Sequence, residues 1–226
     1  MGMLHELICG VWQKAAILND KLFRHGCDFS RWVPQDELGF SEQEGNKYQP
    51  STDTLKRVLK HFRITEKDAA IDIGCGKGKA MYLMSRFPFS EIKGYDLSDE
   101  LVKIANRNFK TLGLARCGAF TADAAVYDDY DRFNYFYLYN SVPEKVFEKL
   151  VGHIWDSIRR NPRKCVFIMM NPHYEAYLKK HTTFRPVYRK KSWISWFDYC
   201  CYQTIPAKAP RQRRDAGNGK EKAWKK

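Results

Sequence analysis

The sequence predicts an α/β fold in which strands and helices alternate and the strands form a mostly parallel sheet. The run Ala69–Ile73 is suited to a buried strand, because only Asp72 interrupts its apolar residues. Three glycines at alternate positions follow it, then a helical pattern and a second short apolar run, Ile92–Tyr95, that ends at Asp96. The order strand, glycine turn, helix, strand is typical of an open sheet that binds its ligand at the strand ends.

Apolar residues at helical or strand spacing predict the other elements along the chain. Helices are expected at Met3–Phe23, Asp53–Phe62, Ala80–Phe87, from Ser98 to Gly113, at Glu144–Arg160 and at Tyr174–His181. Further strands are expected at Cys117–Thr121, Phe133–Tyr139, Lys164–Met170, Phe184–Tyr188 and Trp193–Thr204. Ser51 or Thr52 can cap the second helix, Ser98 can cap the fourth, and Gly113 is expected to end the fourth.

The first predicted helix has an apolar face formed by Leu4, Leu7, Ile8, Val11, Trp12, Ala15 and Leu18. We expect this face to cap the core; a substrate lid or a contact with a membrane surface is the alternative. Residues 1–47 are therefore expected to form an N-terminal helical extension or lid, and residues 48–205 the main domain. Residues 206–226 are rich in Pro, Gly and charge, which predicts a disordered basic tail.

The composition bounds the class of protein. A length of 226 residues, with 44% hydrophobic and 29% charged residues, fits one globular α/β domain with short appendages. No run approaches the ~18 apolar residues that a membrane span needs, and no secretory signal is expected. Seven cysteines without a Cys-x-x-Cys pair favour reduced thiols, no metal site and a cytoplasmic location.

The net charge of +13 favours acidic partners, such as nucleic acid, an anionic membrane surface or acidic small molecules. The excess is uneven along the chain, because residues 207–226 hold eight basic and two acidic side chains. A nucleic acid or another acidic partner is therefore expected to bind through this tail. The oligomeric state is not readable from the sequence.

The spacing of the glycines distinguishes two classes of nucleotide-binding turn. A dinucleotide-binding Gly-x-Gly-x-x-Gly pattern would need a small residue at Lys79. The pattern that is present, Asp-x-Gly-x-Gly-x-Gly from Asp72 to Gly78, resembles the first motif of class I S-adenosylmethionine-dependent methyltransferases. The resemblance covers roughly Tyr48–Ile205 and implies a seven-stranded, mostly parallel Rossmann-like sheet with helices on both faces. It also implies an antiparallel C-terminal hairpin.

The resemblance further implies S-adenosyl-L-methionine as the cofactor. The glycine turn, with Gly74, Cys75, Gly76 and Gly78, would hold its methionine tail. Cys75 is interpreted as a small packing residue and not as a nucleophile. Asp72 would hold the turn and reach the ammonium of the tail through water.

Four residues after the second and third strands are also implied in cofactor binding. Asp96, followed by Leu97, would accept the two ribose hydroxyls. Asp123, followed by Ala124, would accept the adenine amine.

The resemblance also assigns a closing role to residues before the first strand. Tyr48 would pack near the methionine tail and Thr52 would hydrogen-bond it. An ordinary helix start with a packing tyrosine is the alternative.

Two residues at the ends of later strands are the catalytic candidates. Asn140 occupies the position of the fourth motif, where it would contact the cofactor and orient the substrate, or else only cap the strand end. The segment Asn140-Ser141-Val142-Pro143 lacks the adjacent prolines and the terminal aromatic that amino-group methyltransferases carry there, which puts adenine methylation in doubt. His173 is a candidate general base, with a surface residue as the alternative.

The predicted function is methyl transfer from S-adenosylmethionine to an acceptor that the sequence does not identify: a protein lysine, a small molecule or RNA. The first alternative is a catalytically inactive methyltransferase-like module that binds RNA or an acidic partner. The second is a nucleotide-dependent oxidoreductase, against which the glycine spacing argues.

Overall fold

The computed structural model describes residues 3–34, 37–41, 43–192 and 197–204. Its strands are β1 (Ala69–Ile73), β2 (Glu91–Asp96), β3 (Cys117–Thr121), β4 (Tyr135–Tyr139), β5 (Val166–Met170), β6 (Phe184–Lys190) and β7 (Tyr199–Thr204). Its helices are α1 (Met3–Phe23), α2 (Thr54–Leu59), α3 (Lys79–Met84), α4 (Asp99–Thr111), α5 (Glu144–Arg160) and α6 (Glu175–His181).

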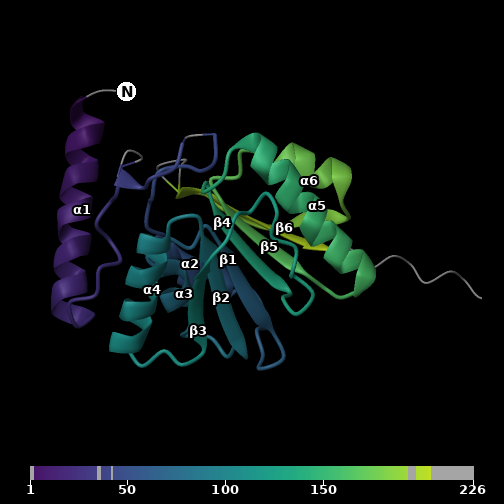
Figure 1. The fold of residues 1–226 in the computed structure, drawn as a ribbon, viewed down its shortest axis with the longest axis horizontal. Helices are drawn as coiled ribbons and strands as arrows, with labels where there is room; N and C mark the ends of the chain where they lie inside the picture. Colours follow the sequence, from purple (N-terminus) through teal and green to yellow (C-terminus); the bar gives the residue numbers. More distant parts are fainter. Residues whose placement is uncertain (1–2, 35–36, 42, 193–196, 205–226) are drawn as a thin grey trace, which may run out of the picture.

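The strands form one seven-stranded sheet in the order β3-β2-β1-β4-β5-β7-β6 (Figure 1). The pairs among β1 to β5 are parallel, whereas β7 is antiparallel to both β5 and β6. The seven-stranded, mostly parallel sheet with an antiparallel hairpin at its C-terminal end is therefore confirmed. Residues 193–196, with which the last strand was expected to begin, lie outside the described residues.

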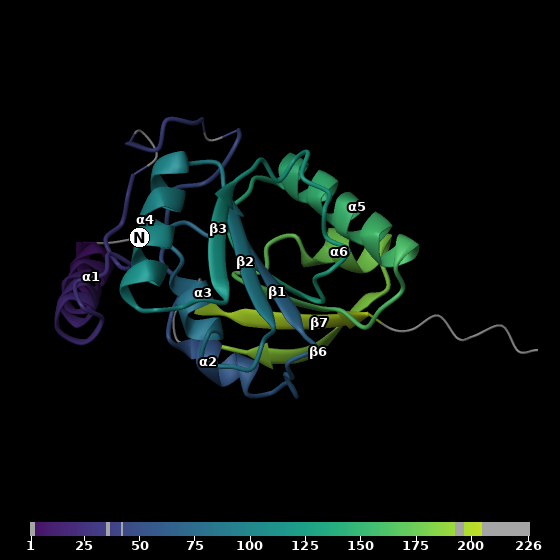
Figure 2. The same cartoon turned by 60° about the horizontal axis from the view of Figure 1, so that its bottom comes forward.

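Helices cover both faces of the sheet (Figures 1 and 2). α5 and α6 pack on one face around Phe147, and α2, α3 and α4 pack on the other around Met81. All five residues of β1 and all five of β5 are buried. Burial on both faces explains why these two strands are nearly continuous apolar runs and do not alternate with polar residues.

The expected ends of α4 are confirmed. The Ser98 hydroxyl accepts a hydrogen bond from the Leu101 N–H at 3.4 Å, and Gly113 has a φ of 63° just beyond the last turn. The same type of prediction at α2 is wrong. Asp53 precedes this helix, and no side chain caps it.

The hydroxyls expected to cap α2 have tyrosine partners in the core. The Ser51 hydroxyl lies 2.8 Å from the Tyr137 hydroxyl, and the Thr52 hydroxyl lies 3.3 Å from that of Tyr199. These partners come from β4 and β7. Tertiary packing therefore overrides a capping preference that is local in sequence.

The expectation that the apolar face of α1 caps the core is wrong for the side chains that the structure describes. α1 lies outside both helical layers in two views (Figures 1 and 2). Val11 and Leu18 are exposed, while the buried side of α1 carries Asp20, ion-paired with the buried Arg24. Within the described residues, no helix is both long and apolar enough to cross a membrane.

Replacing Gly78 tests how tightly the sheet fixes the glycine turn. Gly78 has a φ of 81°, and an added Cβ would overlap the Phe109 ring of α4. We expect Gly78→Ala to lower the free energy of unfolding by ~2–4 kcal/mol, from backbone strain and overpacking. Urea denaturation measures the loss.

Gly113→Ala is the matched control, because Gly113 has a φ of 63° but no atom within 4 Å of an added Cβ. Gly113→Ala should lower the free energy of unfolding by only about 1 kcal/mol, from backbone strain alone. Equal losses in the two variants would show that Phe109 does not confine the turn.

Candidate functional site

The glycine turn joins β1 to α3 and is attached to the end of β2. Gly74, Gly76 and Gly78 have φ values of 70°, 51° and 81°, in the left-handed region that glycine adopts without the steric penalty of a Cβ. The Gly76 N–H donates to Asp96 Oδ2 at 2.8 Å, and the Cys75 N–H donates to the Tyr95 carbonyl at 2.9 Å. Asp96 therefore holds the shape of the turn from the neighbouring strand.

A cavity opens beside this turn, at the carboxyl ends of the parallel strands. β1 lies between β2 and β4, so the chain runs outward from β1 in both directions, and such a switch point is the usual ligand site of an open sheet. The sheet side of the cavity is lined by Gly74, Tyr95, Asp96, Leu97, Leu101, Ala122, Ala124, Tyr139, Ser141 and Val142. The other side is lined by Leu38, Phe40 and residues 44–49 of the segment before α2.

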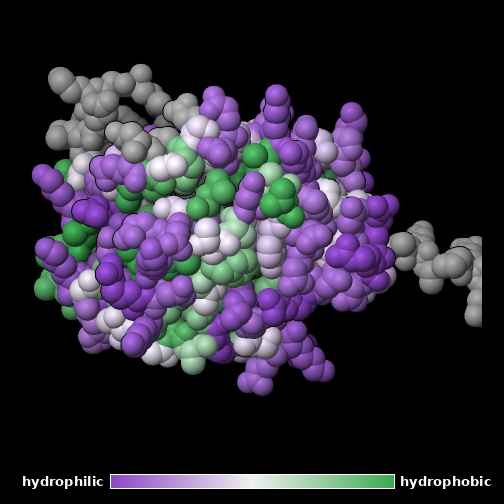
Figure 3. Space-filling model, viewed as in Figure 1, coloured by the Kyte–Doolittle hydropathy of each residue, from purple (hydrophilic) through white to green (hydrophobic). Residues whose placement is uncertain are grey.

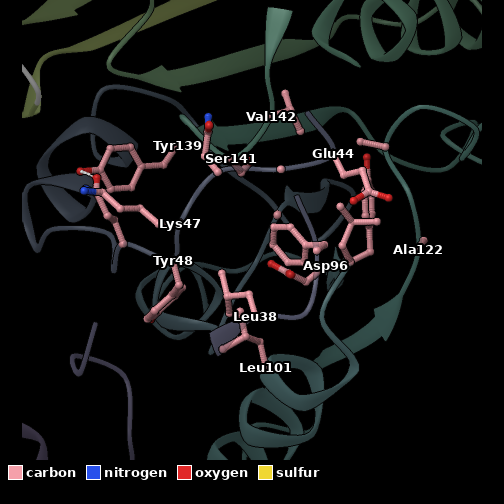
Figure 4. A pocket seen from close by; sticks show the side chains of 18 residues that line it. Leu38, Glu44, Lys47, Tyr48, Asp96, Leu101, Ala122, Tyr139, Ser141 and Val142 are labelled. Atoms are coloured by element: carbon pink, nitrogen blue, oxygen red, sulfur yellow. Dashed lines mark hydrogen bonds between the residues drawn. The ribbon is translucent and has the colours of Figure 1, made fainter. Parts of the chain in front are cut away.

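Figure 4 shows how the labelled side chains are arranged around the cavity. Tyr139 and Lys47 lie toward one end of the cavity, Glu44 and Ala122 toward the other, and Asp96 between them. The cavity thus has a carboxylate near its middle and a mixture of aromatic, aliphatic and polar walls.

The segment before α2 is attached to the sheet by several hydrogen bonds. The Asn46 side chain donates to the Asn140 carbonyl at 2.8 Å, and the Asn46 N–H donates to the Ser141 carbonyl at 3.2 Å. The Tyr139 hydroxyl donates to Gln49 Oε1 at 3.1 Å. Neither Asn46 nor Ser141 was predicted as a site residue, and no local pattern marks residues that meet across 90 or more positions.

Two buried carboxyl groups lie next to the turn. Burial raises the pKa of Asp96, although hydrogen bonds from the backbone of Ser98, Gly76 and Leu97 oppose this shift. Burial, and then the nearby Asp96, raise the pKa of Asp72 well above its usual value. Ionising both carboxyl groups is therefore costly unless a cation lies beside them.

The expectation that Asp72 holds the turn is wrong. Among the described residues, no donor contacts its carboxylate, and the turn is held by Asp96 instead. Asp72 belongs to β1, whereas Asp96 ends β2 at the level of Gly76. Asp72 thus remains a buried acceptor whose hydrogen-bonding capacity the described part of the chain does not use.

Tyr48 lies against the turn and closes it from one side. Its ring occupies the space that a Cβ on Gly76 would need, and its hydroxyl donates to the Phe29 carbonyl at 2.6 Å. This position is compatible with the predicted packing of Tyr48 near the methionine tail. Thr52, paired with Tyr199, does not line the cavity.

Lys77, inside the turn, joins it to the N-terminal segment. Its side chain is fully buried, and its ammonium donates to Asp28 Oδ2 at 2.7 Å and to the Arg31 carbonyl at 3.1 Å. Burial lowers the pKa of Lys77, and the Asp28 carboxylate opposes this shift. This pair was not predicted, because 49 positions separate the two residues.

The remaining residues predicted for cofactor binding fall at and around the cavity. Leu97 and Ala124 line it. Asp123 does not, and its carboxylate accepts the Ala125 N–H at 2.7 Å. The thiol of Cys75 is buried, and burial raises its pKa, as expected of a packing residue.

The two catalytic candidates do not line the cavity. Asn140 has a φ of 45°, and its carbonyl accepts the bond from Asn46, so its backbone positions the cover of the cavity. His173 lies in the loop between β5 and α6. Among the described residues, no group of three or more His, Cys, Asp or Glu side chains could hold a metal ion.

A glycine turn at the switch point, held by a carboxylate at the end of the next strand, defines a nucleotide-binding α/β protein. Residues 70–161 match the family model of the methyltransferase domain. The resemblance to class I methyltransferases is thus confirmed, and the chain has their Rossmann-like fold. No curated protein matches the chain significantly in sequence.

Solved structures share the fold at low identity. A SAM-dependent methyltransferase from Aquifex aeolicus is 12% identical, with a TM-score of 0.51 over 67% of this chain and 89% of that one. An RNA methyltransferase from Salinibacter ruber, in complex with S-adenosyl-L-homocysteine, is 18% identical, with a TM-score of 0.50 over 73% and 97%. A mutant of MtNAS in complex with S-adenosylmethionine is 15% identical, with a TM-score of 0.49 over 69% of this chain. The match spans only 61% of MtNAS, less than two thirds of its length.

The buried Asp72 carboxylate, which no described donor contacts, predicts how stability depends on pH. The raised pKa means that the folded state binds this proton more tightly than the unfolded chain, whose Asp has a pKa of about 3.9. Stability is therefore lost as pH rises from about 4 through the raised pKa. Asp72→Asn removes this loss. The free energy of unfolding of the variant should therefore exceed that of the wild type by ~1–3 kcal/mol at pH 7.5, and by less at pH 5.

Urea denaturation at several pH values measures this difference. Asp128→Asn, at an exposed site, serves as the control and should show no dependence of the difference on pH. A difference for Asp72→Asn that stays constant or shrinks as pH rises would contradict the prediction.

Proposed function

We propose that the chain is a methyltransferase that uses S-adenosyl-L-methionine. The observation that carries this proposal is the Gly74–Gly78 turn, held by the Asp96 carboxylate at the edge of a cavity at the switch point of the sheet. The methyltransferase-domain match over residues 70–161 supports it independently. The Salinibacter ruber enzyme, which shares the fold, is in complex with S-adenosyl-L-homocysteine, and this agrees with the proposed cofactor.

The residues around the cavity fit the chemistry of this cofactor. Asp96 uses one oxygen for the Gly76 N–H and the other for the Ser98 N–H, and the carboxylate retains acceptor capacity for a ribose hydroxyl. The apolar side chains of Leu97, Leu101, Ala124 and Val142 would contact the adenine ring. Asp123 remains a predicted acceptor for the adenine amine. Its carboxylate would then accept hydrogen bonds from both the amine and the Ala125 N–H.

Asp72 and Asp96 fit the cationic part of the cofactor. Both carboxyl groups are buried, and Asp96 further raises the pKa of Asp72, so a bound ammonium or sulfonium would offset the cost of ionising them. Asp72, which has no donor among the described residues, would accept from the ammonium of the methionine tail. The turn around Gly74 would lie along this tail.

When bound, the cofactor supplies a methyl group that its sulfonium already activates. The chain then has to hold the acceptor in line and exclude water. Asn46, Gln49 and Tyr139 form the hydrogen bonds that keep the covering segment on the sheet. We assign them to exclusion of water; Asn140 positions this cover, and His173 remains a candidate base.

Among the possible acceptors, a small molecule fits the cavity better than a protein lysine or RNA, because the segment before α2 covers part of it. Leu38, Phe40, Tyr48 and Tyr139 give it apolar and aromatic walls. The segment before α2 covers it through hydrogen bonds to Asn140 and Ser141. An extended macromolecular acceptor would need an open groove at this position.

Calorimetry with S-adenosylhomocysteine tests the cofactor. Asp96→Ala removes a charged acceptor, and hydrogen bonds to charged groups contribute ~1.5–3 kcal/mol each, so binding should weaken about tenfold to a hundredfold. Asp99→Ala, at an exposed carboxylate three residues away, is the control and should bind as the wild type does. Thermal melts verify that both variants are folded.

Failure of the wild type to bind at millimolar ligand would dismiss the proposal. Equal affinities of the wild type and Asp96→Ala would place the ligand elsewhere.

The inactive RNA-binding module remains the second candidate, because neither predicted catalytic side chain, Asn140 nor His173, lines the cavity. It predicts that the basic residues 207–226 carry salt-sensitive binding. Deleting these residues should then lower the affinity for single-stranded RNA by at least about tenfold at low salt, as measured by fluorescence anisotropy. An unchanged affinity would contradict the hypothesis that residues 207–226 bind RNA.

A further inference from the structure

α1 presents an apolar face that the rest of the described chain does not cover. Val11, Leu18 and Leu22 are 61%, 54% and 65% exposed, and Ala15 between them is exposed as well. At about 100° per residue, these four positions fall within roughly 60° of one another on the helix. Hydrophobic atoms reach the surface along the edge of the molecule that α1 forms (Figure 3).

The orientation of α1 is fixed from its opposite side. Asp20 points about 170° away from the apolar face, and it is buried. Its carboxylate pairs with Arg24 and accepts the Phe29 N–H at 3.2 Å. Because a buried charge is costly without its partners, this network keeps the polar side of α1 on the protein and its apolar side turned outward.

The exposed charged side chains that the structure describes on α1 lie beside this apolar face and share one sign. Lys14 and Lys21 are exposed and lie about 40–60° from it on one side. Among the described side chains of α1, the acidic one is Asp20, which is buried on the opposite side. An apolar stripe edged by lysines is the pattern of a helix that lies in the interface of an anionic bilayer.

We propose that α1 binds the surface of an anionic lipid bilayer with Val11, Ala15, Leu18 and Leu22. The four side chains insert at the level of the headgroups, while Lys14 and Lys21 contact lipid phosphates. The net charge of +13 attracts the whole chain to such a surface.

A second copy of the chain fits the same face less well. Antiparallel pairing of two such helices would bring their lysine rows together, and parallel pairing would place no acidic side chain of α1, among those described, opposite Lys14 or Lys21. Two chains of charge +13 also repel each other. Charge complementarity therefore selects the anionic bilayer.

Vesicle flotation with the full-length protein tests the proposal. The wild type should bind vesicles of phosphatidylcholine and phosphatidylglycerol at least about tenfold more tightly than vesicles of phosphatidylcholine alone. The double variant Leu18→Ser/Leu22→Ser should lose about tenfold or more of this binding. Lys14→Glu/Lys21→Glu should lose the preference for phosphatidylglycerol.

Val187→Ser, at an exposed apolar residue of β6, is the matched control and should bind as the wild type does. Thermal melts should match among all variants, because every substituted side chain is exposed. The proposal is overturned if the wild type does not bind anionic vesicles, or if the double leucine variant binds them equally well. It is also overturned if light scattering shows a dimer that this variant abolishes.

Discussion

The hydrogen bond from the Gly76 N–H to Asp96 Oδ2, at 2.8 Å, is the constraint on which the rest of the site depends. It joins the ends of β1 and β2 and fixes a turn in which three glycines have positive φ values. The turn ends at Gly78, where α3 begins. At Gly74 it lines the cavity with backbone atoms, because glycine has no side chain. The same carboxylate lines the cavity, so one residue both fixes the turn and forms part of the cavity wall.

The fold was predictable to the extent that each element depends on its own residues. β1 and β5 are buried on both faces, and their apolar runs indicate this directly. The two wrong predictions about the helices concern contacts that a helix's own residues do not determine. Ser51 could have capped α2, but Tyr137 of β4 takes its hydroxyl. The periodicity of α1 reveals an apolar face without revealing what this face contacts.

The candidate site divides in the same way. The glycine turn and Asp96 form a local pattern, and the structure brings them together at one cavity. The pairing of Asn46 with Asn140 spans 94 positions and has no sequence signature. Asp72 shows a third case: it directly precedes the turn in sequence, but the hydrogen bond to the turn that was expected of it is formed by Asp96 at the end of the neighbouring strand.

The buried pair of Lys77 and Asp28 has a consequence for any shortened form of the chain. Lys77 belongs to the glycine turn, but the carboxylate that neutralises it, Asp28, comes from a loop far N-terminal in the chain. Trimming the chain past Asp28 would strand a positive charge in the interior, at a cost of about 3–5 kcal/mol if the ammonium stayed charged. The Asp28 carboxylate is thus the counterion of Lys77. Removing its loop to obtain a shorter protein would destabilise the glycine turn that the shorter protein was meant to retain.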